Sequence, residues 1–344
     1  MQLRQPLNLR QPLQMTAHKI RPTLNLPFAS SGTLGPLITF TRSSPASYFN
    51  SSGILTAAST NEARFDYNPS TLVARGLLIE EARTNLFLNS LINGTNLSTQ
   101  NVTTAATPYT LSFYGTGTIT LSGTSVGSLV GSGAYPIRST LTFTPSAGTL
   151  TCTVTGTVQY AQIEAGSFAT SFIPTAGVTV TRAADVASIT GANFSGFWNA
   201  TQGTIVVGFM NEAAVTAATF PTVVRASDGT SNNFITVNQI STNNRTYAAG
   251  TTGGVAQWDI NSSSGTYNTT ALTAYKAALA YQANNIGYSL AGTAAGTDTS
   301  ATIPTVNRLE IGSANSSGFV NGWISSLSYY PVRLTNSQLQ TLST

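Results

Sequence analysis

The stretch Arg64-Phe-Asp-Tyr-Asn-Pro-Ser-Thr-Leu-Val-Ala-Arg-Gly-Leu-Leu-Ile-Glu-Glu-Ala-Arg-Thr-Asn-Leu86 is the most informative part of this chain. Only 26 of the 344 residues are charged, yet six of them lie here. Within the stretch, the apolar run 77–79 is flanked by four charged residues: Arg75, Glu80, Glu81 and Arg83. This arrangement predicts a short buried strand whose ends carry structural ion pairs, because charges this scarce are poorly explained as solubilising decoration.

The composition favours a folded protein with few charges on its surface. Charged residues make up 8% of the chain, against roughly 25% in an ordinary soluble protein. Hydrophobic residues reach 41%, which argues against disorder, since disorder requires low hydrophobicity and high charge. Weak electrostatic repulsion between copies makes self-assembly plausible, and we expect a homo-oligomer.

The net charge of +4 comes from the beginning of the chain. Residues 1–61 contain five basic residues and no acidic one, whereas the rest contains ten basic and eleven acidic residues. This basic segment has no aromatic residue before Phe28, so it lacks the interleaved aromatics expected of a nucleic-acid surface. We therefore expect no nucleic-acid partner. No run of about 18 apolar residues predicts a membrane span, and no secretory signal is visible.

Residues 1–35 are predicted to form an extended arm. The sequence Leu-Arg-Gln-Pro-Leu occurs twice, at 3–7 and 9–13, and repeated prolines exclude a continuous helix. A polyproline-like path is expected instead. The arm would anchor the protein in a groove of a partner through these residues: Leu3, Arg4, Leu7, Leu9, Arg10 and Leu13. The alternative is a disordered leader.

The remainder of the chain predicts an all-β fold with two antiparallel β-sandwich domains. Short runs that alternate apolar and small polar residues, separated by glycine-rich turns, predict one sandwich over 95–186 and another over 187–344. Residues 36–94 form a separate collar in this division. The single cysteine, Cys152, lies in such a run and is predicted to be buried. Thr335 is expected to cap a short terminal helix that docks through Leu339 and Leu342.

Two parts of the chain resemble proteins of tailed phages, and a third resembles a common jelly-roll fold. The segments 39–42, 64–67 and 75–86 resemble a collar found in phage tail-fibre and head-fibre proteins. The segments 162–175 and 181–185 look like the closing strand of carbohydrate-binding-module-like jelly rolls in phage tail proteins. The strands after residue 187 and the terminal helix resemble a concanavalin-A-like (laminin-G-like) jelly roll. The resemblance covers most of residues 36–344 and implies a β-jelly-roll architecture.

The sequence offers little for catalysis or for a bound metal. The single histidine, His18, has no acidic residue within 40 positions, so a serine–histidine–acid arrangement is not expected. One cysteine and one histidine do not build a zinc site. Asp298 and Asp259 are possible calcium ligands, with ordinary turn aspartates as the alternative. We expect no enzymatic activity, no metal and no cofactor.

One cluster in the C-terminal sandwich is the candidate for sugar binding. Aromatic rings stack on the apolar faces of sugars, and polar neighbours then bond to the hydroxyls. The residues of this candidate site are Trp258, Asp259, Asn261, Tyr247 and Tyr267. The alternative is that Trp258 points inward from its strand and belongs to the core. Trp323 is expected in the core, and Trp198 at the edge of the sandwich.

The sequence therefore predicts a structural protein of a phage virion surface, a fibre that is made in the host cytoplasm and attached through its arm. The attachment partner would be the capsid or the tail baseplate, and the sandwiches would adhere to host-surface glycans. The resemblance to phage fibres implies a homotrimer. The main alternative is a capsid decoration or head-fibre protein with a structural role, and a lesser one is a polysaccharide depolymerase.

Overall fold

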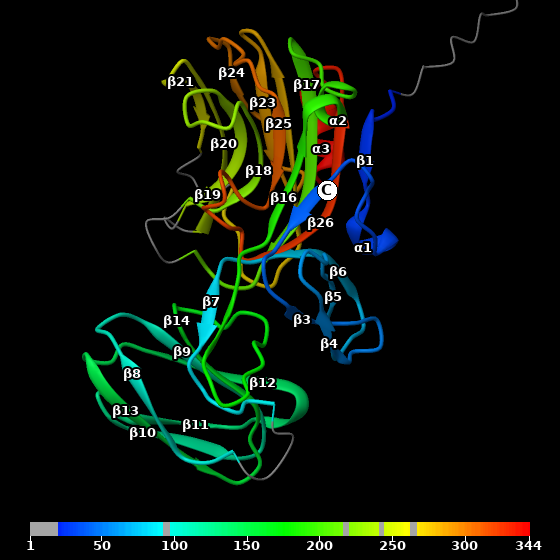
Figure 1. The fold of residues 1–344 in the computed structure, drawn as a ribbon. Coiled ribbons are helices and arrows are strands. Elements are labelled where there is room, and N and C mark those ends of the chain that lie inside the picture. The colour runs from blue at the N-terminus through cyan, green and yellow to red at the C-terminus, as the bar shows by residue number, and fades with distance from the viewer. Residues whose placement is uncertain (1–19, 92–96, 216–219, 241–243, 262–266) are drawn as a thin grey trace, which may run out of the picture.

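The computed structural model describes residues 20–91, 97–215, 220–240, 244–261 and 267–344. Within these ranges the regular secondary structure is almost entirely antiparallel β-strand, which confirms the predicted all-β fold class. Figure 1 shows two lobes, one above the other. The lower lobe is formed by the segment between β7 (Arg83–Asn85) and β15 (Val180–Arg182), and the upper lobe by the chain on either side of that segment.

The upper lobe is a sandwich of two large sheets. The eight-stranded sheet has the order β24 (Gly296–Asp298), β23 (Ile286–Leu290), β22 (Tyr275–Gln282), β17 (Gln202–Asn211), β26 (Gly322–Tyr330), β6 (Ala74–Ile79) and β5 (Phe65–Tyr67), with β1 (Leu24–Leu26) also paired to β26. The seven-stranded sheet has the order β2 (Thr39–Thr41), β16 (Val186–Thr190), β25 (Arg308–Ile311), β18 (Thr222–Ser227), β19 (Phe234–Ile240), β20 (Arg245–Thr252) and β21 (Val255–Ile260).

Strands from the predicted collar belong to these two sheets. β6 pairs with β26 and β2 pairs with β16. The hairpin of β3 (Ala46–Phe49) and β4 (Leu55–Ala58) forms a small sheet of its own, and β7 pairs with β15 in another. The reason is burial: Leu77 and Ile79 of β6 are fully buried in the core of the upper sandwich. A strand this apolar needs a covered sheet, and strands after residue 187 supply it. The lower sandwich is thus inserted between parts of the upper one.

The lower lobe is a smaller sandwich. Its four-stranded sheet has the order β11 (Gly127–Val130), β10 (Thr118–Gly123), β13 (Gly148–Thr155) and β8 (Gln100–Thr104), and its three-stranded sheet the order β12 (Gly133–Phe143), β9 (Tyr109–Gly115) and β14 (Gln159–Ala165). Alternate residues of these strands point inward and form one core, which includes Phe113, Leu150 and Ile163. Cys152 is fully buried in this core, as predicted.

The helices of the described ranges are short: α1 (Phe28–Ser31), α2 (Gly191–Ser195) and α3 (Asn336–Leu342). Thr335 caps α3, as predicted, and its hydroxyl and the side chain of Gln338 form a reciprocal capping box. Leu339 is fully buried and Leu342 packs beside it. None of these helices has the length or apolar character to cross a membrane.

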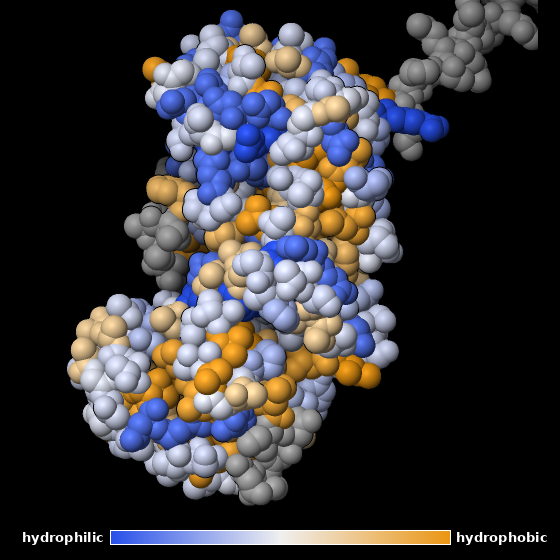
Figure 2. Space-filling model, in the orientation of Figure 1, coloured by the Kyte–Doolittle hydropathy of each residue, from blue (hydrophilic) through white to orange (hydrophobic). Residues whose placement is uncertain are grey.

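The predicted anchor residues Leu3 to Leu13 and His18 lie outside the described residues. The later part of the predicted arm is ordered, because Leu24 and Leu26 pack into the core of the upper sandwich through β1. On the face shown in Figure 2, apolar residues gather over the lower lobe and polar residues over much of the upper lobe.

Candidate functional site: the cleft between the two sandwiches

A buried cluster of five charged residues lies where the two sandwiches meet. We call Arg42, Arg64, Glu80, Arg182 and Asp185 the buried charge cluster; the side chains of its arginines and of Asp185 have no solvent exposure. Arg64 bonds to Glu80 at 2.8 Å and also to Asp185. Arg42 bonds to Asp185 at 3.0 Å, and Arg182 lies 3.5 Å from Glu80.

The carboxylates of the cluster are held by hydrogen bonds as well as by opposite charges. Burial alone would raise the pKa of Glu80, but Arg182, Arg64 and two hydrogen bonds from Ser171 outweigh it and lower the pKa to about 2. Burial likewise disfavours the charge of Arg64, yet Asp185 and Glu80 raise its pKa. The backbone N–H of Glu80 donates to Asp185 at 2.9 Å. Glu80 is therefore ionised at neutral pH, and both carboxylates of the cluster accept several hydrogen bonds.

This cluster ties the lower sandwich to the upper one. Ser171, on the segment that closes the lower sandwich, donates to Glu80 and accepts from Arg64 at 2.6 Å. The hairpin of β3 and β4 adds a second tie: Tyr135 of β12 accepts from Leu55 N–H at 2.9 Å and donates to the Gly53 carbonyl at 3.0 Å. These contacts fix the position of the two lobes around the space between them.

The four charged residues predicted to form ion pairs do so, but only one pair lies within this set of four. Glu81 pairs with Arg83, but Arg75 pairs with Asp66 at 3.4 Å, and Glu80 pairs with members of the buried charge cluster. Adjacent residues of an extended chain point in opposite directions, so Glu80 and Glu81 cannot share a partner. Side-chain exposure separates them: it is 6% for Glu80 and 34% for Glu81.

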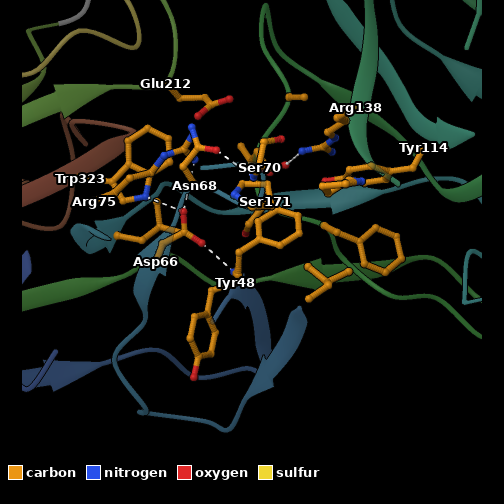
Figure 3. A pocket seen from close by; sticks show the side chains of 18 of the residues that line it. Tyr48, Asp66, Asn68, Ser70, Arg75, Tyr114, Arg138, Ser171, Glu212 and Trp323 are labelled. Carbon is orange, nitrogen blue, oxygen red and sulfur yellow. Dashed lines mark hydrogen bonds and ion pairs between the residues drawn. The ribbon is translucent and has the colours of Figure 1, made fainter. Parts of the chain in front are cut away.

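A cleft of about 300 Å³ lies beside the buried charge cluster. Figure 3 shows its lining, which comes from both sandwiches and from the β3 strand. Its volume falls at the lower end of the range of roughly 300–1,000 Å³ that ligand pockets occupy. Ser70 and Ile137 line it and are exposed to solvent, so a ligand can reach it from outside.

Arg75 and Trp323 form the wall of the cleft on the upper sandwich. The guanidinium carbon of Arg75 lies 4.3 Å from the centre of the Trp323 ring, and a cation over an indole face is attracted to it. Asp66 holds both residues: it accepts from the indole N–H at 2.9 Å and pairs with Arg75. A third bond, from the backbone N–H of Phe49 at 2.7 Å, completes the set. The carboxylate of Asp66 therefore holds Arg75 and Trp323 in position and is not free to bind a ligand.

The lower sandwich contributes Arg138 and Tyr114. Arg138 donates to the Thr170 carbonyl at 2.6 Å and to the Ser112 hydroxyl at 2.8 Å, and its guanidinium lies 5.8 Å from the Tyr114 ring centre. Glu212, which follows β17, also lines the cleft. Burial raises the pKa of Glu212 to about 7, against the opposing influence of Arg75 and Arg138. The cleft therefore contains a carboxyl group that changes charge near neutral pH.

The sugar-binding residues predicted from the sequence do not lie in this cleft. Trp258 is 3% exposed, Tyr267 is 3% exposed and Tyr247 is 9% exposed, so their rings offer no free face to a sugar. Trp258 and Tyr267 belong to the core of the upper sandwich, which corresponds to the alternative interpretation. Asp259 and Asn261 are exposed. In the described ranges, no group of histidine, cysteine, aspartate and glutamate side chains is arranged to hold a metal ion.

Sequence reasoning missed Arg138, Tyr114 and Glu212. Each is a single residue at the end or middle of an ordinary strand pattern, and nothing near it in sequence marks it. It also missed Arg42, Arg64 and Asp185 as ion-pair partners of the strand ends. The available signal was that charged residues are scarce in this chain, so that those present are expected to pair with one another. Nearly a fifth of them lie in the buried charge cluster.

Comparisons with known proteins give structural resemblances at low identity. No family model and no curated protein matches the chain. A mutant of the NanB sialidase from Streptococcus pneumoniae is 11% identical with a TM-score of 0.37, and the match covers 45% of this chain and 26% of that one. The chain thus spans about a quarter of the sialidase.

Two smaller proteins match over more of their own length. The CBM40 of the Ruminococcus gnavus IT-sialidase is 13% identical with a TM-score of 0.34, over 42% of this chain and 84% of that one. The second is domain 4 of AbnA, a GH43 extracellular arabinanase from Geobacillus stearothermophilus, whose structure was solved in complex with arabinotriose. It is 14% identical with a TM-score of 0.37, and the match covers 47% of this chain and 73% of that one. At this level of similarity, the names of these proteins say nothing about the ligand of this chain.

Proposed function

We propose that the protein is a phage virion surface protein that adheres to host-surface glycans, and that the glycan binds in the cleft between the two sandwiches. The cleft carries this proposal, because it combines an accessible cavity with several polar groups that converge on it, Arg75, Arg138 and Glu212 among them. Convergent polar groups in a concave site are the usual mark of a small-molecule site.

The virion role rests on the phage-like segments of the sequence. The stretch 64–86, which carries that resemblance, supplies Arg64, Arg75 and Glu80 and so builds both the buried charge cluster and one wall of the cleft. A homotrimer and attachment to the capsid or tail baseplate are part of the same proposal. These remain predictions from the resemblance.

A binding role without catalysis is supported by how the carboxylates of the cleft are used. Glycosidases typically need two carboxyl groups on opposite sides of the scissile bond. Asp66 is held by three bonds, and Glu80 is neutralised by Arg64 and Arg182. Glu212 is then the one lining carboxyl group in the described ranges that is left for a ligand. A single such group suits recognition better than hydrolysis.

Blocking the cleft should abolish glycan binding. Ser70 lines the cleft and is exposed, so Ser70→Trp would fill the opening without disturbing the core. We expect binding to an array of bacterial oligosaccharides to fall at least about tenfold, since a bulky side chain occupies the ligand volume. The matched control is Ser128→Trp on β11, which is exposed and does not line the cleft. Equal binding by the two variants would remove the cleft from the proposal.

Two deletions of the arm should behave differently. Removing residues 2–19 should leave a folded protein with unchanged melting temperature that no longer joins particles. Removing residues 2–27 also deletes β1, whose Leu24 and Leu26 are buried, at a cost of about 1.5–3 kcal/mol for each leucine. Thermal unfolding and particle incorporation measure the two effects. Incorporation of the shorter deletion at the normal level would contradict the anchor.

A further inference from the structure

Glu212 presents an unpaired carboxyl group to the cleft. Its backbone N–H donates to the Asn321 carbonyl at 3.0 Å, which fixes the start of the side chain. Its carboxyl group makes no hydrogen bond or ion pair with any residue in the described ranges. An ionised carboxylate only accepts hydrogen bonds, so this group lacks donors.

Arg75 has guanidinium nitrogens without hydrogen-bond acceptors, which complements the carboxyl group of Glu212 without donors. Its Nη1 faces Asp66 at 3.4 Å, and its plane lies over Trp323, so its position is fixed. Its Nε and Nη2 atoms have no hydrogen-bond acceptor among the residues that the structure describes. A guanidinium only donates, so this group lacks acceptors. Glu212 and Arg75 line the same cavity, as Figure 3 shows.

We propose that the ligand of the cleft is an uncharged saccharide whose adjacent hydroxyls bridge Glu212 and Arg75, with Glu212 ionised in the complex. A hydroxyl both donates and accepts, so two neighbouring hydroxyls can donate to the carboxylate and accept from the guanidinium. This inference rests on the proposed glycan-binding function and specifies its ligand class.

The charges of the cleft disfavour a charged sugar of either sign. Asp66 pairs with Arg75, Glu80 pairs with Arg64 and Arg182, and Arg42 and Arg64 also pair with Asp185, so each of these charges has an opposite charge beside it. Of the lining charges, Glu212 and Arg138 are left, and they offset each other. An acidic sugar would add a carboxylate beside Glu212, and an amino sugar would add a cation beside Arg138 and Arg75. An uncharged polyol leaves this balance unchanged.

Binding should release a proton, which gives the inference a direct signature. Burial raises the pKa of Glu212 to about 7; Arg75 and Arg138 oppose this, while Glu80 and Asp66 add to it. Hydroxyls that donate to the carboxylate stabilise its ionised form and lower its pKa. Ligand binding therefore favours the deprotonated protein, and affinity is highest above pH 7 and falls as the pH drops below it.

The test uses the full chain and an array of neutral and acidic oligosaccharides at pH 8.5 and 5.5. Neutral glycans should dominate, and the affinity for the strongest should fall about tenfold from pH 8.5 to 5.5. Calorimetry near pH 7, where Glu212 of the free protein is still partly protonated, should show proton release on binding by the wild type when it is run in two buffers of different ionisation enthalpy. Glu212→Gln should bind about tenfold to a hundredfold more weakly at pH 8.5, with no difference between the two pH values. Glu62→Gln, an exposed site on the same lobe, should match the wild type.

The possible outcomes distinguish a wrong ligand class from a wrong proposed function. Binding by the wild type that prefers acidic glycans, or that shows neither proton release nor a decline at low pH, would overturn the ligand assignment and leave glycan binding intact. Absence of binding to every arrayed glycan at both pH values would overturn the proposed function itself. The calorimetric proton count is made on the wild type, so the test holds even where Glu212→Gln folds poorly.

Discussion

Replacing Arg64 with methionine is expected to lower the free energy of unfolding by about 3–5 kcal/mol, because removing one partner of a buried ion pair leaves an uncompensated charge. Arg64 is fully buried and bonds to both carboxylates of the buried charge cluster, Glu80 and Asp185. Its loss also removes the hydrogen bond to Ser171, which ties the lower sandwich to the upper one. Urea unfolding followed by fluorescence measures the effect.

Arg83→Met is the matched control. Arg83 is largely buried, but its partner Glu81 is 34% exposed, so the carboxylate left behind stays hydrated and the loss should be smaller, about 1 kcal/mol. The pH dependence gives a second check. The pKa of Glu80 is lowered from 4.5 to about 2, so the stability it contributes is present above pH 4.5 and lost as the pH falls toward 2. The gap between wild type and Arg64→Met should narrow over that window. Equal stabilities of the two methionine variants would contradict the cluster's structural role.

Replacing Trp258 with alanine is expected to cost about 3–5 kcal/mol, the usual loss for a large aromatic residue in a core. Trp258 is 3% exposed and belongs to the core of the upper sandwich. The packing is tight: a Cβ added at Gly250 would lie 2.1 Å from the indole ring. The variant should unfold at a visibly lower temperature by circular dichroism, and any loss of adhesion should follow from that unfolding.

Phe220→Ala is the control for this variant. Phe220 is 58% exposed, so its removal should change stability by less than about 0.5 kcal/mol. A Trp258→Ala protein that keeps its melting temperature and loses glycan binding would instead place the sugar site at Trp258, as first predicted from the sequence.

The fold was largely predictable because its signals are local. Alternating apolar and small polar residues indicate strands wherever one face is buried, and the runs around Cys152 and Thr118 became β13 and β10. The capping box at Thr335 is also local, since it needs only Thr335 and Gln338. The apolar run 77–79 predicted a buried strand for the same reason, and it lies within β6.

The connections between distant segments were not predictable in this way. A buried β6 needs a hydrogen-bonded strand beside it. Nothing in residues 74–79 indicates that this strand is β26, which lies more than 240 residues later in the sequence. The buried charge of Glu80 likewise needs an oppositely charged side chain beside it. In the sequence, Arg83 is the nearest basic residue that could pair with it. The true partners, Arg64 and Arg182, come together only when the lower sandwich closes.

The candidate site failed to emerge from the sequence because its residues come from different sandwiches. A tryptophan beside aspartate and asparagine, as at 258–261, fits a sugar site only when its ring faces outward, and strand alternation leaves the direction open. Glu212 and Arg138 carry no local pattern at all. Their meaning comes from the space that they share with Arg75.

Hydrogen–deuterium exchange with and without the glycan that binds best tests most directly whether the ligand sits between the two sandwiches. The account predicts slower exchange in residues 66–75, 136–138 and 169–172 and around Glu212, the segments that line the cleft. Slower exchange confined to β19, β20 and β21, with these segments unchanged, would contradict it and return the binding site to the region of Trp258.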